Sequence, residues 1–232
     1  MTAALLLVFC AMVASPPWQI TTASPRPDVR VTRTLTGTRV RISGTAAPSL
    51  DLFVVGGPGL RVFRQEHLEP LWDGSFAADL TLGDPGLYMA FAEFVSASGW
   101  PQVAQQVFMT GSPLGERPGD PVDEPHVSNG IRVAMDASAV KSGGKTSLTF
   151  DASDEASGTP VTDLEGYLGA PAHLFVVSAD LTEAQHLIPD EGRVGPRLSF
   201  SPLFPRKGRY KLWLAMRRAG RVATVPFVID VH

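Results

Sequence analysis

The sequence of 232 residues contains a single cysteine, Cys10. One cysteine cannot form a disulfide within the chain, and it cannot supply the several thiolates of a structural zinc site. We expect Cys10 to act as a small apolar side chain, because it lies in an apolar run. The scarcity of cysteine therefore removes disulfide scaffolds and thiolate metal centres from consideration.

Long apolar runs are also scarce. The longest covers residues 3–14, and no charged residue occurs from Thr2 to Pro25. A run of this length is too short to cross about 30 Å of hydrocarbon as a helix, but it suits the apolar core of a secretory signal. No Lys or Arg precedes it, whereas several arginines follow it, which is the reverse of the usual signal bias. Residues 1–24 are therefore predicted to be either a signal peptide or a membrane anchor.

Motifs for catalysis are missing as well. The sequence has no nucleophile elbow, no metal-hydrolase helix, no glycine-rich nucleotide loop and no paired-carboxylate motif. The formal net charge of −3 gives no long-range attraction to nucleic acid. We therefore expect a protein that is not an enzyme, has no cofactor and does not bind nucleic acid.

What the sequence does contain is a repeat. Leu174–Val177 has the same residues, Leu-Phe-Val-Val, as Leu52–Val55, which lies 122 positions earlier. His186–Pro189 matches His67–Pro70 at a separation of 119 positions. Anchors that keep nearly the same separation, with length changes between them, are typical of two copies of one folded unit, because loops tolerate insertions and core strands do not.

Short apolar runs separated by turns predict β-strands in both copies. The 20 prolines and 22 glycines lie mainly between these runs. Residues 29–35 alternate apolar and polar side chains, whereas Leu50–Val55 is apolar at every position except Asp51 and predicts a central strand. Seven short strands in each copy, with turns every 8 to 12 residues or so, are typical of an immunoglobulin-like sandwich.

The predicted fold class is therefore all-β, with two tandem immunoglobulin-like β-sandwich domains after an N-terminal apolar segment. Domain 1 is expected at residues 25–112 and domain 2 at residues 127–232. Residues 113–126 between them hold four prolines and few apolar residues, so we expect an extended, semi-rigid linker.

A series of short motifs runs through the second copy: Asp163–Ala170, His173-Leu174, Asp180-Leu181, His186–Pro189, Gly208–Trp213 and Val222–Phe227. Together they resemble a bacterial exported β-sandwich module that is often found beside heavy-metal-binding and copper-handling domains. The resemblance covers nearly all of residues 160–231 and, more weakly, residues 50–110. In that family the segment matching His186–Pro189 usually carries two histidines flanking a leucine. This chain has Ile188 at the second place and Glu69 in the first copy, so each copy lacks one ligand.

Two hypotheses about function follow. In the first, the chain is a non-catalytic structural or docking subunit that binds a partner protein on the periplasmic side of a membrane complex, with residues 3–14 at the membrane surface. Its contacts are expected in exposed loops, at Gly56, Gly57, Pro58, Gly59, Glu183 and Arg193.

In the second hypothesis, the chain is a periplasmic protein that binds or delivers copper or another heavy metal. His173 and His186 are the candidate ligands, with Met216 or Met135 as a soft third ligand for Cu(I). A structural alternative stays open, in which His67 and His186 each bond to the backbone at a proline-bounded turn.

Overall fold

A computed structural model describes residues 27–34, 37–111, 120–137, 140–144, 146–190 and 195–232. The predicted signal peptide or anchor at residues 1–24 and the first half of the predicted linker, residues 113–119, lie outside the described residues. Within the described ranges, no helix is long and apolar enough to cross a membrane.

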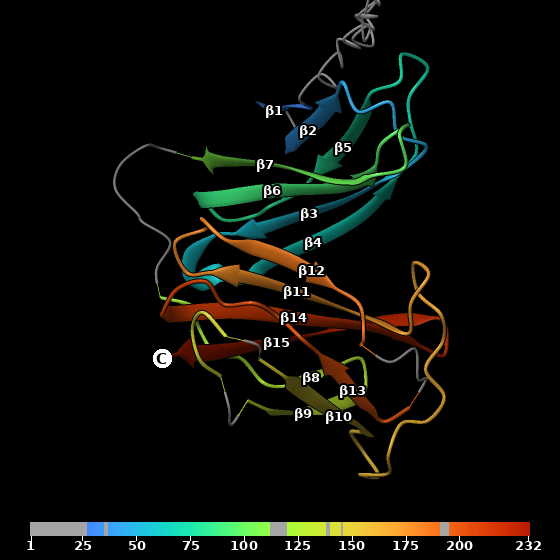
Figure 1. The fold of residues 1–232 in the computed structure, drawn as a ribbon, viewed down its shortest axis with the longest axis vertical. Coiled ribbons are helices and arrows are strands. Elements are labelled where there is room, and N and C mark those ends of the chain that lie inside the picture. The colour runs from blue at the N-terminus through green and yellow to red at the C-terminus, as the bar shows by residue number, and fades with distance from the viewer. Residues whose placement is uncertain (1–26, 35–36, 112–119, 138–139, 145, 191–194) are drawn as a thin grey trace, which may run out of the picture.

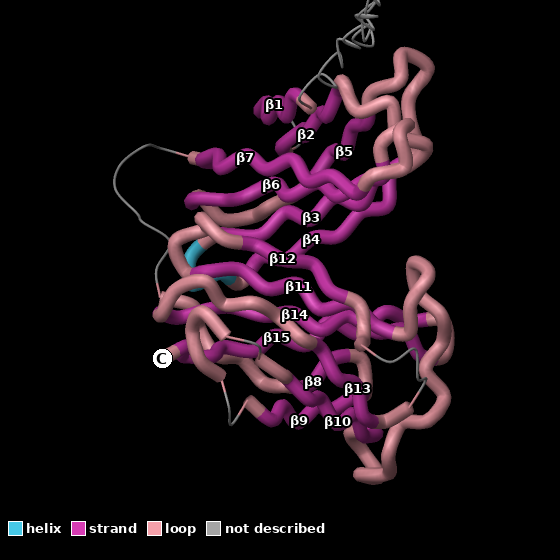
Figure 2. The backbone as a smooth tube through the Cα atoms, viewed as in Figure 1, coloured by secondary structure: helices cyan, strands magenta, loops and turns pink. Residues whose placement is uncertain are grey.

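Fifteen strands make up the described structure, joined by tight turns and loops (Figures 1 and 2). The strands of the first half are β1 (Asp28–Arg33), β2 (Thr38–Ser43), β3 (Leu50–Gly56), β4 (Val62–Leu68), β5 (Phe76–Leu80), β6 (Gly86–Val95) and β7 (Pro101–Thr110). Those of the second half are β8 (Val127–Ser128), β9 (Ile131–Asp136), β10 (Leu148–Asp154), β11 (Ala172–Ser178), β12 (Ala184–Leu187), β13 (Arg197–Phe200), β14 (Gly208–Arg218) and β15 (Arg221–Val231). One short helical turn, η1 (Pro58–Leu60), follows β3 and is cyan in Figure 2.

The described strands form four antiparallel sheets, two in each half of the chain. Domain 1 contains the sheets β1-β2-β5 and β4-β3-β6-β7, and domain 2 contains β12-β11-β14-β15 and β13-β10-β9-β8. None of these sheets mixes strands from the two halves. The sheets follow one another along the long axis of the molecule (Figure 1). The predicted all-β class with two tandem β-sandwiches is therefore confirmed.

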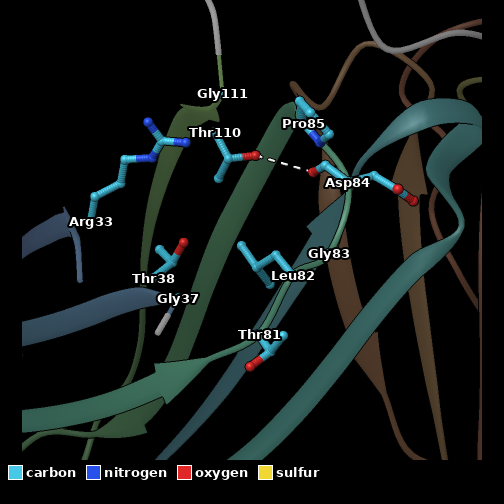
Figure 3. Close-up of a pocket in the computed structure, with 10 residues that line it drawn as sticks. All are labelled: Arg33, Gly37, Thr38, Thr81, Leu82, Gly83, Asp84, Pro85, Thr110 and Gly111. Atoms are coloured by element: carbon cyan, nitrogen blue, oxygen red, sulfur yellow. Dashed lines mark hydrogen bonds between the residues drawn. The ribbon is translucent and has the colours of Figure 1, made fainter. Parts of the chain in front are cut away.

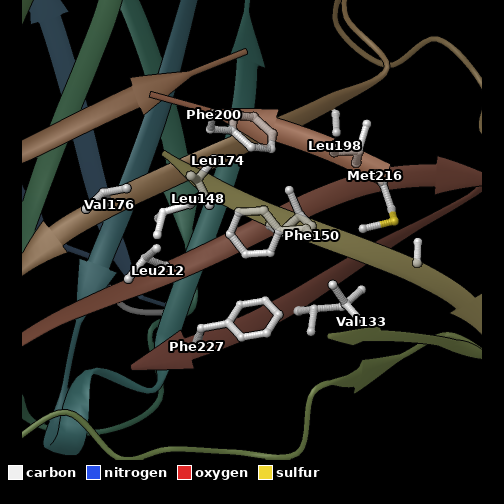
Figure 4. Close-up of a cluster of buried hydrophobic side chains, with 14 of the residues drawn as sticks. Val133, Leu148, Phe150, Leu174, Val176, Leu198, Phe200, Leu212, Met216 and Phe227 are labelled. Carbon is white, nitrogen blue, oxygen red and sulfur yellow. The ribbon is translucent and has the colours of Figure 1, made fainter. Parts of the chain in front are cut away.

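Each sandwich closes over its own apolar core. Side chains that alternate along a strand point to opposite faces, so every second residue enters the core. In domain 2 the core joins Phe150 and Phe200 of the outer sheet to Leu174, Leu212 and Phe227 of the inner sheet (Figure 4). Domain 1 has the corresponding core between its two sheets. These two cores are what the repeated strand pattern predicts.

A third apolar cluster joins the two domains. It contains Phe53, Val55, Leu60, Met89 and Phe91 from domain 1, and Phe175, Val177, Leu181 and Trp213 from domain 2. The two inner sheets therefore pack face to face, and strands β3 and β11 are buried on both faces. A strand that is buried on both faces needs apolar residues on both faces, which explains why Leu52–Val55 and Leu174–Val177 within these strands are continuously apolar instead of alternating.

The contacts across this junction follow the repeat. Phe53 and Phe175 occupy the same place in the two copies, and their rings stack on each other with centroids 4.7 Å apart. Phe63 of β4 stacks on Trp213 of β14 at 5.0 Å. Equivalent residues that meet each other are the mark of an isologous interface, which is the arrangement of a symmetric dimer. Here the arrangement is built within one chain.

The strand register corrects one detail of the sequence alignment. Phe53 pairs with Gln65 in domain 1, and Phe175 pairs with His186 in domain 2. The structural counterpart of His186 is therefore Gln65, whereas the sequence motif had matched His186 with His67. The similar letters are displaced by two positions along the strand, a shift that keeps the same face of the sheet.

Phenylalanine substitutions at the junction test this packing. We expect Phe53→Ala and Phe175→Ala each to lower the free energy of unfolding by about 3–5 kcal/mol, because each leaves a cavity in a buried cluster. The double variant is expected to cost about 0.5–1.5 kcal/mol less than the sum, because the stacked pair is lost only once. Urea denaturation measures all three values. The matched control combines Phe53→Ala with Phe150→Ala in the separate core of domain 2, and full additivity of the Phe53–Phe175 pair would contradict the stacking.

Candidate functional site

A groove of about 420 Å³ opens at one edge of the domain junction. Domain 1 contributes the start of β3 and the end of β6, and domain 2 contributes β11, β12 and the loop before β11. Its lining combines apolar side chains with Ser49 and four ionisable residues. The ionisable residues are Asp51, Glu93, His173 and His186.

Three of these residues, Glu93, His186 and His173, form a hydrogen-bonded chain across the junction. Glu93 Oε2 of domain 1 lies 2.6 Å from His186 Nδ1 of domain 2. His186 Nε2 lies 2.9 Å from His173 Nδ1, and His173 Nε2 lies 2.6 Å from the carbonyl oxygen of Tyr167. The rings of the two histidines are nearly parallel, at an interplanar angle of 16°. The predicted proximity of His173 and His186 is therefore observed, and Glu93 completes the chain.

The protons of this chain follow from its partners. A carbonyl oxygen only accepts hydrogen bonds, so His173 Nε2 must carry a proton and donate to Tyr167. Burial is the largest cause that lowers the pKa of His173, and the neighbouring charge of His186 lowers it further. A neutral His173 then accepts from His186 Nε2 through its Nδ1. The contact between His186 Nδ1 and Glu93 Oε2 needs one further proton, which the two groups share in a short hydrogen bond.

A second histidine lies beside the groove on domain 1. His67 Nδ1 is 2.8 Å from Asp51 Oδ1, and His67 Nε2 is 3.7 Å from a Glu69 carboxylate oxygen. A hydrolytic triad would need a nucleophile where Glu69 lies. The Tyr167 hydroxyl is near the same carboxylates. Burial, followed by the charges of Asp51 and Glu66, raises the pKa of this hydroxyl.

The predicted metal ligands do not come together as a set. Met216 is wrong as a ligand, because it pairs with Ala172 on the core face of the sheet and lies in the apolar core of domain 2. His173 is on the opposite face, towards domain 1. Side-chain alternation separates the two residues, so no rotation of a side chain brings the sulfur to the histidines.

The other two predicted ligands, His173 and His186, lie together in the groove. The facing nitrogens of His173 and His186 are occupied by the hydrogen bond between them. The described residues contain no group of three or more His, Cys, Asp or Glu placed to hold a metal ion.

The predicted contact loop after β3 is part of the domain junction. Gly56, Gly57 and Gly59 are buried, and only Pro58 is exposed. A Cβ on Gly56 would collide with the carbonyl oxygen of Leu87, and one on Gly59 would collide with Val122 of the linker. Gly56 has a φ of 147°, which side-chain-bearing residues rarely adopt. These glycines permit close approach within the chain, so their prediction as a contact surface is wrong.

The second predicted contact region is also used within the chain. Glu183 accepts hydrogen bonds from Arg206 and from the Tyr210 hydroxyl, which lies 2.6 Å away. Burial, with the hydrogen bond to Glu183 and its charge, raises the pKa of Tyr210 to about 12. Glu183 therefore ties a turn to the sheet. Arg193 lies outside the described residues.

Another hollow, of about 230 Å³, lies at one end of domain 1 (Figure 3). Turn and strand-end residues form most of it, and the Thr110 hydroxyl donates to the carbonyl oxygen of Asp84. Arg33 is the cationic residue of its lining. No convergent set of polar side chains is built here, so the groove at the domain junction is the better candidate site.

Sequence reasoning missed Asp51 and Glu93. Asp51 interrupts the apolar run that begins with Leu50, and Glu93 interrupts the run from Leu87 to Val95. A carboxylate inside a strand that is otherwise buried on both faces is the signal that identifies such a site, since an unpaired buried charge is costly.

A family model described as a domain of unknown function, DUF8832, matches residues 126–232, which is domain 2. None of the curated proteins compared with the chain matches it.

Solved structures give distant likenesses. The tetra-tandem repeat in the extending region of a large adhesion protein is 9% identical, covers 88% of this chain and 48% of its own, and has a TM-score of 0.30. The BSP domain of a biofilm-associated protein is 12% identical, covers 88% of this chain and 29% of its own, with a TM-score of 0.25. A β-glucuronidase from Parabacteroides merdae is 8% identical, covers 87% and 24%, and has a TM-score of 0.24. This chain spans less than half of each of those chains.

The lowered pKa of His173 predicts a pH dependence of stability. The unfolded state binds a proton at His173 near its ordinary pKa of about 6.5, whereas the folded state keeps the ring neutral. The contribution of His173 is therefore present above about pH 6.5 and is lost as the pH falls towards the folded pKa. We expect His173→Gln to weaken the fall in unfolding free energy between pH 7 and pH 5, as measured by urea denaturation. A His173 ring that titrates above pH 6.5 by NMR would contradict this.

Glu93 is expected to stabilise the junction. Hydrogen bonds to charged groups contribute about 1.5–3 kcal/mol, so Glu93→Ala should lower the unfolding free energy by about 2 kcal/mol. Glu93→Gln should cost less, about 1 kcal/mol, because its amide oxygen still accepts from His186. The control is Glu69→Gln at a mainly exposed side chain, where we expect a change within about 0.5 kcal/mol. Equal losses of unfolding free energy in Glu93→Ala and Glu69→Gln would refute a stabilising role for the hydrogen bond between Glu93 and His186.

Proposed function

We propose that the protein is a non-catalytic structural or docking subunit outside the cytoplasm, which binds a partner protein on the periplasmic side of a membrane complex. The observation that carries this proposal is the apolar rim of the junction groove. Val95 of domain 1 is 49% exposed, and Leu168 and Ile188 of domain 2 are 37% and 58% exposed. Exposed apolar side chains that gather in one place are typical of protein-binding sites.

The rigidity of the junction supports this role. The rim is assembled from both domains, and the shared apolar cluster holds these domains against each other. A surface that is preformed in this way loses little conformational entropy when a partner binds.

The arrangement of the histidines supports a non-catalytic role. In a hydrolytic triad, the nitrogen distant from the carboxylate activates a nucleophile. Here the nitrogen of His186 that is distant from Glu93 is Nε2, and it faces the imidazole of His173. His173 in turn donates to the carbonyl oxygen of Tyr167. The groups are paired with one another and support the junction.

Location outside the cytoplasm is supported by the sequence alone. The uncharged segment before Pro25 contains the apolar run at residues 3–14, which suits export with or without retention at the membrane. A periplasmic reporter such as alkaline phosphatase, fused after His232, is expected to be active. An inactive reporter on an intact fusion would refute export.

The docking role is tested by isolating the tagged full-length chain from gently solubilised membranes of its source. We expect a complex of fixed stoichiometry by size-exclusion chromatography, without copper in amounts equal to the chain by elemental analysis. A chain that elutes alone under all mild detergents contradicts the docking role. Stoichiometric copper that is lost in His186→Ala would favour the metal-binding hypothesis instead.

A further inference from the structure

The two inner sheets overlap in a staggered way, so that each has one strand beyond the other. Contacts between Phe63 and Trp213 place β4 over β14, and the bond from Glu93 to His186 places β6 over β12. The next strands outward are β7 in domain 1 and β15 in domain 2, which are the last strands of their sheets. The strand register makes these two strands equivalent, but one of them is covered by another part of the chain and the other is exposed.

The junction-facing side of β15 is covered by the end of the linker. The amide of Val122 donates to the carbonyl oxygen of Gly59 at 3.0 Å. Lys211, which is fully buried, donates to the Val122 carbonyl oxygen at 2.6 Å and to Glu124 at 2.9 Å. Glu124 and Pro125 then lie along a hollow that β15 lines with Thr224 and Pro226.

The same side of β7 is open. Leu87, Met89 and Glu93 of β6 face the junction, and each pairs with a β7 residue on the same face of the sheet. These β7 partners are Met109, Val107 and Val103, which are 47%, 40% and 50% exposed. Together with the exposed Gln105, which pairs with Phe91 on the same face, they form a strip about 20 Å long, since a strand rises about 3.3 Å per residue. Three of the four side chains of this strip are apolar. Val103 lies opposite Glu93, so the strip leads directly into the junction groove.

The two sides also differ in charge. On the covered side, Lys211 binds the carboxylate of Glu124, and Arg61 and Arg64 line the same hollow. On the open side, the described residues that line the groove include Asp51 and Glu93 and no Lys or Arg. Asp51 bonds to His67 through Oδ1, and Glu93 bonds to His186 through Oε2. An acidic segment therefore covers a basic face, whereas the uncovered face is acidic.

We infer that the open face binds an extended segment of a partner protein, with apolar side chains against Val103, Val107 and Met109 and a Lys or Arg directed at Glu93 and Asp51. The linker shows within this molecule how such a face is covered. The assignment rests on the proposed docking role and names the surface that performs it. A charged side chain of the partner meets carboxylates in a partly desolvated groove, which gives orientation as well as attraction.

Binding is tested with three synthetic ten-residue peptides that share one apolar, proline-containing framework and differ at two positions, which hold Lys, Glu or Gln. Fluorescence anisotropy with the full-length chain is expected to show at least about tenfold tighter binding of the Lys peptide than of the Glu peptide. Val107→Asp should weaken the Lys peptide about tenfold. Val222→Asp is the matched control, because Val222 is similarly exposed on β15, and it should have no effect. Equal binding of all three peptides, or binding that survives Val107→Asp, would overturn the assignment.

Other occupants have their own signatures. A photo-crosslinker at position 107 that reacts with residues 1–26 of the same chain would assign the face to the N-terminal segment and overturn a partner. Concentration-dependent dimers that Val107→Asp abolishes would assign it to a second copy. The Val107→Asp chain is first shown to be folded by its melting curve. If it still co-purifies with the membrane complex, the open face of β7 is not the binding surface, but the docking role stands. If the wild-type chain forms no complex, the docking role itself fails.

Discussion

The apolar contact between the two inner sheets is the constraint on which the rest of the molecule depends. Because Phe53 stacks on Phe175, the two sandwiches share one cluster of buried side chains and behave as four layers in place of two independent domains. Each inner sheet must then be apolar on both faces. Glu93 and His186 bond to each other at one edge of this contact, where the groove opens.

A duplicated chain that packs against itself produces two equivalent edges but has one linker between its copies. The linker can cover one edge, and here it covers β15. The side chain that the linker covers differs between the two domains. Domain 1 has Met89 at this position, and domain 2 has Lys211, which binds the carboxylate of Glu124 in the linker. Near-symmetry in the fold therefore leads to a real asymmetry at the surface, with one basic edge that is occupied and one acidic edge that is open.

The repeat made the fold predictable, and side-chain alternation explains which parts of the site were not. Continuous apolar runs correctly indicated β3 and β11 as central strands, but sequence alone did not show that their second faces meet each other. His173 and His186 were correctly expected to approach. Met216 was wrongly added, because residue type suggested a ligand while the strand register places its sulfur on the other face. Gly56 and Gly59 suggested a loop surface, whereas their small size serves close packing inside the junction.

Glu93 and His186 each have an equivalent position in the other domain, and the residues at these positions show what the hydrogen bond between Glu93 and His186 contributes. Gln65 occupies in domain 1 the place that His186 occupies in domain 2, and Ala215 occupies the place of Glu93. Within the described structure the Gln65 Nε2 is buried without a hydrogen-bond partner, since Ala215 offers no acceptor there. The junction therefore folds with one of its two polar pairs left incomplete. Apolar packing is sufficient to join the domains, and the pair of Glu93 and His186 is free to set the charge and shape of the open groove.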